Sequence, residues 1–106
     1  MSQIYYNQKL IKLIEKLFIN GKDAREKLIE NEDLIHTVYL ASNSNDLDTK
    51  TKTSWNKIWN DLNTSKEIIL TKDRTISSFR NTVSSKRNKT LSKYLQLIFE
   101  EYCKII

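Results

Sequence analysis

The side chains best suited to chemistry gather in one segment of this 106-residue chain, from Lys72 to Lys93. The segment holds seven basic residues and one acid, Asp73, and no further acid follows before Glu100. The whole chain has 18 basic and 13 acidic residues. Outside this segment there are 11 basic and 12 acidic residues, so the remainder of the chain is nearly neutral. The formal charge of +5 therefore resides in this segment. Such a local cationic excess is typical of a surface that contacts nucleic-acid phosphates.

The apolar spacing predicts that residues 72–88 form a helix, with Ile76, Phe79 and Val83 on one buried stripe. Short hydrogen-bonding side chains and one arginine dominate the opposite face, and four of them are expected to face DNA bases: Arg74, Ser77, Ser78 and Asn81. Four cations at its borders are expected to contact phosphates: Arg80, Lys86, Arg87 and Lys89. An ordinary solvated surface helix is the alternative, but its polar face typically mixes Glu with Lys. The pattern favours a basic helix, 72–89, that enters the major groove of duplex DNA.

The residues needed for catalysis or metal binding do not form a recognisable pattern. His36 is the single histidine and Cys103 the single cysteine, and no glycine-rich phosphate loop is present. We therefore expect no enzymatic activity, no metal and no cofactor. Trp55 and Trp59 are spaced four residues apart on an apolar face, which is more typical of a core than of stacking platforms for bases. We assign Trp55 to the core, and the sequence leaves Trp59 open.

The elements that must position these residues are predicted to be helices. The chain has no proline and one glycine, which favours a single all-α domain over residues 1–106. Apolar periodicity predicts an N-terminal helix over 4–20, a second helix opened by Asp23 and Glu26, a third near 54–62 and a last helix over 90–105. A polar loop is expected over 42–53, and its order without a partner stays open. The run Ile68–Leu70 fits either a helical turn or a strand-like connector.

Three short motifs lie within residues 30–88, one on each of three expected helices: Leu34-Ile35-x-x-Val38, Trp55-x-x-Ile58-x-x-x-Leu62, and Arg74-Thr75-x-x-x-Phe79-Arg80. Together they resemble a Myb/SANT-type domain, with the MADF branch as the nearest type. Phe79-x-Asn81 also resembles the motif of a homeodomain recognition helix, in which the asparagine meets adenine. The resemblance implies a Myb/homeodomain-like three-helix core over 24–88 with extra N- and C-terminal helices. It also implies DNA binding, with Asn81 as a base-reading residue.

These observations lead to a functional expectation and an alternative. We expect a non-catalytic subunit of a larger DNA-modifying or transcription/chromatin complex, which binds double-stranded DNA and contacts a protein partner through its N- and C-terminal helices. The start of the chain does not resemble a signal peptide and no stretch is apolar enough to span a membrane, so we expect an intracellular protein, nuclear if eukaryotic. The alternative is a small helical protein-binding factor (an inhibitor, immunity-type protein or scaffold subunit) whose basic helix docks on an acidic protein surface.

Overall fold

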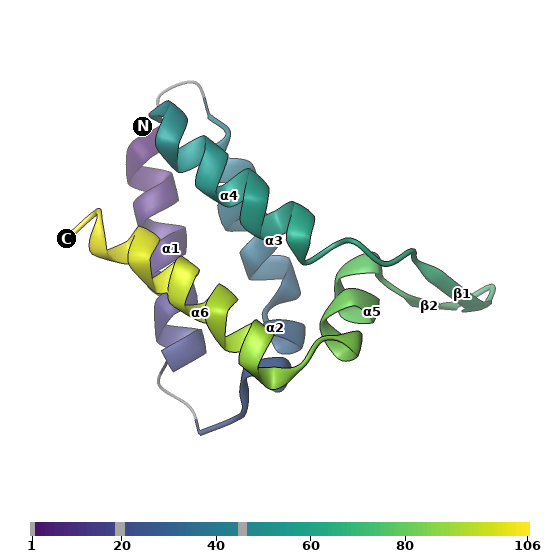
Figure 1. Cartoon of the computed structure of the whole chain (residues 1–106). Coiled ribbons are helices and arrows are strands. Elements are labelled where there is room, and N and C mark those ends of the chain that lie inside the picture. The colour runs from purple at the N-terminus through teal and green to yellow at the C-terminus, as the bar shows by residue number, and fades with distance from the viewer. Residues whose placement is uncertain (1, 19–20, 45–46) are drawn as a thin grey trace.

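The computed structural model describes residues 2–18, 21–44 and 47–106, and over these ranges the protein is predominantly helical (Figure 1). The all-α class is therefore confirmed. In chain order the described elements are α1 (Ser2–Phe18), α2 (Ala24–Glu30), α3 (Glu32–Ser42), α4 (Thr49–Asp61), β1 (Ile68–Thr71), β2 (Arg74–Ile76), α5 (Ser78–Ser85) and α6 (Asn88–Cys103). The predicted N-terminal helix corresponds to α1, although its last two predicted residues, 19 and 20, lie outside the described ranges.

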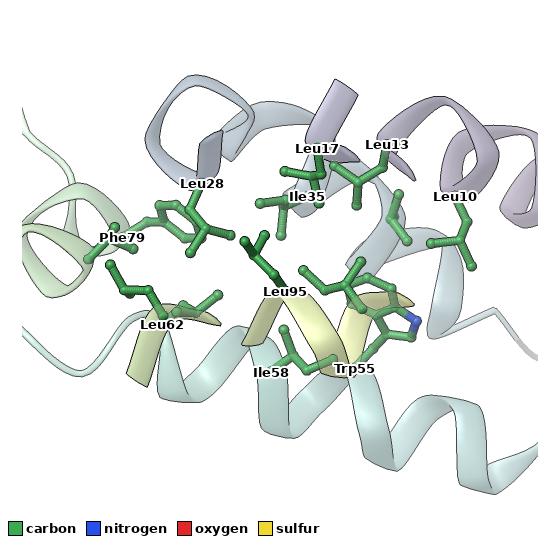
Figure 2. Close-up of a cluster of buried hydrophobic side chains, with 14 of the residues drawn as sticks. Leu10, Leu13, Leu17, Leu28, Ile35, Trp55, Ile58, Leu62, Phe79 and Leu95 are labelled. Carbon is green, nitrogen blue, oxygen red and sulfur yellow. The ribbon is translucent and has the colours of Figure 1, made fainter. Parts of the chain in front are cut away.

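Buried apolar side chains from all six helices form one cluster. Leu28, Leu62 and Phe79 lie at one end of the cluster, and Leu10 and Trp55 at the other (Figure 2). Within this arrangement α1 packs on α3 and α6, α3 packs on α4, and α2 contacts both α5 and α6. Contacts between helices distant in the chain therefore hold the bundle together through apolar burial.

One buried hydrogen bond ties α1 to α4 inside this core. The indole Nε1 of Trp55 donates to the hydroxyl of Tyr6 at 2.8 Å, and both side chains are almost completely buried. The assignment of Trp55 to the core is thus confirmed. The bond satisfies a polar group that would otherwise be costly to bury.

Two helix boundaries differ from the sequence prediction because local capping decides them. The single helix expected after Asp23 is broken at Asn31, where the side-chain Nδ2 donates to the carbonyl of Lys27 at 2.8 Å and satisfies an end of α2. Farther along, α4 begins at Thr49, about one turn before the predicted start. There the carboxylate of Asp48 accepts from the backbone N–H of Thr51 at 2.7 Å, which is an N-cap. The expected loop over 42–53 is correspondingly shorter, and residues 45–46 lie outside the described ranges.

The predicted helix over 72–88 is wrong in its first part. Residues 68–76 instead form an antiparallel hairpin, in which Ile68 pairs with Ile76 and Ile69 with Thr75, with an irregularity between Ile69 and Thr71. Both strands are rich in β-branched residues, which favour this conformation. The helix begins only at Ser78, because the hydroxyl of Ser77 caps it by accepting from the N–H of Arg80 at 3.0 Å.

The remainder of the predicted basic helix, 72–89, is also divided. Helix α5 ends at Ser85, Lys86 is extended, and α6 begins at Asn88. Phe79 and Val83 are buried as predicted, whereas Ile76 is only half-buried in β2. Apolar residues recur at helical spacing across the segment, but only the eight residues of α5 form a helix before the chain turns into α6.

The hairpin extends away from the bundle beyond α5 (Figure 1). Every residue of β1 is exposed, and the two strands mainly contact each other rather than a helix. No helix among the described residues is long and apolar enough to cross a membrane.

Candidate nucleic-acid interface

Eight cations lie on the hairpin and the segment before it, on α5, on the α5–α6 connection and on the first turns of α6, and we call this surface the cationic end: Lys66, Lys72, Arg74, Arg80, Lys86, Arg87, Lys89 and Lys93. All of them are exposed except Lys86, which is half-buried. The same stretch of chain contains two carboxylates, Glu67 and Asp73. Within the described residues, no carboxylate lies within ion-pair distance of any of the eight. The positive charge of this end is therefore not neutralised by ion pairs within the described chain.

The polar face of α5 anchors the segment that leads into the hairpin. The hydroxyl of Ser78 donates to the carbonyls of Asn63 and Ser65, at 3.0 and 2.6 Å. Asn81 donates from its amide nitrogen to the carbonyl of Lys66 at 2.8 Å. The hydroxyl of Thr82, a buried residue, accepts from the N–H of Ser65 at 2.8 Å. These bonds fix the base of the hairpin against the helix, so α5 determines where the hairpin emerges.

The four residues predicted to face DNA bases are consequently not presented on one helix face. Ser77 lies before α5, where its hydroxyl also donates to a carboxylate oxygen of Glu32 at 2.9 Å. Ser78 and Asn81 are half-buried and direct their donors to the backbone of their own chain. Arg74 is exposed, but it lies in β2. Base reading by a helix that carries all four residues is incompatible with this geometry.

The four predicted phosphate contacts are placed more favourably. Arg80 is exposed on α5, Arg87 is exposed in the connection to α6, and Lys89 is exposed in the first turn of α6. Lys86 is half-buried, with its Nζ 6.0 Å from the centre of the Tyr94 ring. The structure therefore brings these cations to one end of the molecule, although on three different segments rather than along one helix.

The connection between α5 and α6 is held by contacts from two other helices. The guanidinium of Arg25 in α2 donates to the carbonyl of Lys86. The Tyr94 hydroxyl donates to Asp61 at 2.9 Å, and burial and this hydrogen bond raise the pKa of Tyr94. Lys57 also donates to Asp61 at 2.9 Å, and this ammonium is the main cause that lowers the pKa of the carboxyl. These contacts position Lys86 and Arg87 relative to the bundle.

A hollow of about 570 Å³ separates the hairpin from α5. Leu70 and Ile76 contribute apolar surface to it, and Arg74 and Arg80 contribute positive charge from the strand and from the helix. The hollow therefore combines apolar surface with two guanidinium groups and the carboxylate of Asp73.

Trp59, which the sequence left open, stacks on aromatic side chains of its own chain. Its ring is half-buried, with ring centroids 4.7 Å from His36, 5.4 Å from Tyr39 and 5.5 Å from Phe79. The stack links α3, α4 and α5, so Trp59 has a packing role. Among the described residues, no three His, Cys, Asp or Glu side chains gather closely enough to hold a metal ion.

The strand-like alternative for Ile68–Leu70 is the one that the structure has. The second strand was predicted as part of a helix, so the hairpin was not predicted, and Lys66, Ile69 and Leu70 were not proposed as contact residues. A signal for the hairpin was present. Residues 68–71 and 74–76 are rich in β-branched residues, and the two residues Lys72-Asp73 separate them. Two such runs around a two-residue turn are typical of a hairpin.

The motifs that resemble a Myb/SANT domain are distributed over both helices and strand. The first lies on α3, the second spans α4 and Leu62, and Phe79-Arg80 lies on α5, whereas Arg74 and Thr75 lie in β2. No family model matches the chain, and neither a curated protein nor a solved structure matches it.

Proposed function

We propose that this protein is a non-catalytic subunit that binds double-stranded DNA through its cationic end. The observation that carries the proposal is that none of the eight cations of this end forms an ion pair within the described residues, although Glu67 and Asp73 of the same stretch, Glu32 of α3 and Asp61 of α4 lie nearby. Unpaired surface cations attract a polyanion and release its counterions on binding. This function requires phosphate contacts from Arg80, Lys86, Arg87 and Lys89, and it requires no base reading by α5.

The salt dependence of duplex binding provides the test. If half to all of the eight cations contact phosphates, log affinity falls against log salt with a slope of about −4 to −7. Fluorescence anisotropy of a labelled duplex of mixed sequence, titrated from low to physiological salt, measures this slope. The double variant Arg80→Ala/Arg87→Ala is expected to reduce the slope by about 2 and to weaken binding to all sequences alike.

A matched control removes two exposed cations elsewhere, Lys12 of α1 and Lys50 of α4. The variant Lys12→Ala/Lys50→Ala changes the net charge by the same amount and is expected to keep the wild-type slope. If both double variants behave alike, only net charge matters and the cationic end is not the binding surface. If wild-type protein does not bind duplex DNA at low salt, the proposal is refuted.

We propose further that the terminal helices bind a protein partner, so that the chain is part of a larger DNA-modifying, transcription or chromatin complex. Ile4, Ile11 and Phe18 are exposed and spaced seven residues apart, so they form one stripe along α1. The Phe18 ring contacts that of Phe99 in α6, with centroids 5.4 Å apart, and extends the apolar surface onto the last helix. For a eukaryotic source this proposal implies a nuclear location.

The partner surface is tested by affinity capture from native extract with wild-type protein and with Ile4→Ser/Ile11→Ser. A partner retained by the wild type and lost in the variant supports the proposal. A strict monomer on gel filtration with no partner retained by either protein contradicts it.

The second candidate function is a protein-binding factor whose cationic end docks on an acidic protein. The observation that favours it is the exposed apolar surface of β1, since all four strand residues are exposed. The absence of duplex binding at low salt, together with binding to an acidic protein partner, selects this candidate over the first.

A further inference from the structure

We infer that the β1–β2 hairpin is an arm that enters the minor groove of the bound duplex, with Ile69 and Leu70 as apolar wedges against the bases. This inference rests on the proposed function and adds to it the element, the groove and the mode of contact. It assigns a role to residues outside the set of cations.

The hairpin exposes large apolar side chains at a position that protrudes from the bundle. Ile69 is 72% exposed and Leu70 is 56% exposed, although both side chains are large and apolar. They lie on a hairpin that extends beyond α5 (Figure 1), and its strands mainly contact each other. Apolar residues on an extended arm gain nothing from the fold of their own chain, which points to burial in a partner.

The hairpin is held against the bundle at its base. Hydrogen bonds with side chains of α5 fix the base of the arm at Ser65 and Lys66, and no such bond to α5 reaches the described strand residues beyond. Figure 1 shows that the arm leaves the bundle next to α5. A fixed base and a free tip suit an element that inserts into a groove while the bundle stays on the backbone.

Cations near the apolar residues of the arm complement the negative charge of DNA phosphates. Lys72 lies in the turn and Arg74 follows it on β2, while Arg80 faces the hairpin across the hollow that Leu70 also lines. Asp73 is the single carboxylate between Leu70 and Arg80 in the sequence. Leu70 thus lies beside Arg74 and Arg80, with Asp73 on the same hollow, and these two cations and Lys72 would meet the phosphates that flank a groove.

The chemistry of the arm selects the minor groove. Base reading in the major groove uses Asn, Gln and Arg pairs, whereas proteins that bend DNA from the minor groove insert apolar side chains between base steps. The exposed side chains of β1 are Ile, Ile, Leu and Thr, which cannot make the bidentate contacts of major-groove readers, and Arg74 of β2 is the one residue of the two strands that could. We therefore expect the bound duplex to be bent.

The test compares Ile69→Ser/Leu70→Ser with Leu40→Ser, a control on α3 that is 58% exposed and so closely matches Leu70. All variants keep the wild-type charge. The probe is a duplex of about three helical turns that carries an AT-rich centre and one fluorophore at each end. Anisotropy then reports binding, and energy transfer between the two ends reports bending.

Wild-type protein and Leu40→Ser are expected to increase energy transfer, and netropsin, which occupies the minor groove, is expected to compete with both. The double variant is expected to bind about tenfold or more weakly with an unchanged salt slope, and to give no increase in energy transfer. Its thermal melt is expected to match the wild type, because the arm packs little on the bundle.

Three results overturn the inference and leave the proposed function intact. The first is double-variant binding at wild-type affinity, and the second is wild-type binding with the expected salt slope but without bending or netropsin competition. The third concerns the other groove. If a duplex with 7-deazaguanine and 7-deazaadenine weakens binding while netropsin does not, the arm reads the major groove and the inference is wrong. Failure of wild-type protein to bind any duplex refutes both the proposed function and the inference.

Discussion

The buried hydrogen bond between Tyr6 and Trp55 gives the sharpest prediction for stability. The exposed fraction is 1% for Tyr6 and 0% for Trp55, and the hydroxyl oxygen lies 2.8 Å from the indole nitrogen. In Tyr6→Phe the ring remains, but the indole N–H stays buried without its acceptor. Such an unsatisfied donor costs about 1–3 kcal/mol, which for a chain of this size lowers Tm by about 5–15 °C.

The same residue predicts how stability depends on pH. Burial raises the pKa of Tyr6 to about 12, while an unfolded tyrosine titrates near 10. Between these values the folded state holds a proton that the unfolded state has lost, so the free energy of unfolding falls as pH rises. The contribution is complete below pH about 10 and is lost at a rate of about 1.4 kcal/mol per pH unit up to pH about 12.

Urea unfolding followed by tryptophan fluorescence measures both effects in one experiment. The difference in unfolding free energy between wild type and Tyr6→Phe is expected to be about 1–3 kcal/mol at pH 7 and to shrink between pH 10 and 12. Tyr5→Phe is the control, because Tyr5 is an exposed neighbour on the same helix. The reasoning is refuted if Tyr6→Phe matches the control at pH 7, or if the difference is the same at both ends of the pH range.

Three further predictions concern the cationic end and its supports. Asn81→Ala removes the hydrogen bond to the carbonyl of Lys66, so we expect faster amide exchange in the hairpin. Binding to AT-rich and GC-rich duplexes is expected to change equally. A selective loss of binding to one of the two duplexes would instead support base reading. Thr82→Val leaves the half-buried N–H of Ser65 without its acceptor and is expected to cost about 1–2 kcal/mol in thermal unfolding, whereas a melt identical to the wild type contradicts this role. The pKa of Asp61 is lowered in the folded state, so this carboxylate stabilises the fold above its unfolded pKa, and that stability is lost as pH falls through the folded pKa. Asp61→Asn is therefore expected to make Tm depend less on pH in the acid range. An unchanged dependence of Tm on acid pH contradicts this role of Asp61.

The sequence alone determined the helical class and much of the core. Prolines are absent and glycine is nearly so, and apolar residues recur at helical spacing along α1, where the structure buries Leu10, Leu13 and Leu17 but leaves Ile11 and Phe18 exposed. Phe79 and Val83 were predicted to be buried, because burial follows from the hydrophobicity and spacing of the residues themselves. The excess of positive charge in residues 72–93 was also evident from the sequence, because formal charge depends only on which residues are present.

Only the tertiary structure decided what the polar residues of α5 do. Ser77, Ser78 and Asn81 have the hydrogen-bonding groups of base-reading residues, and the sequence contains nothing that tells a donor free for DNA from a donor used internally. That distinction depends on where the carbonyls of residues 63–66 lie after α4 has packed, a contact between segments 13 to 15 residues apart. These carbonyls follow α4, whose Trp59 stacks on Phe79 of α5, and the hairpin that they lead into takes the place of the first part of the long basic helix.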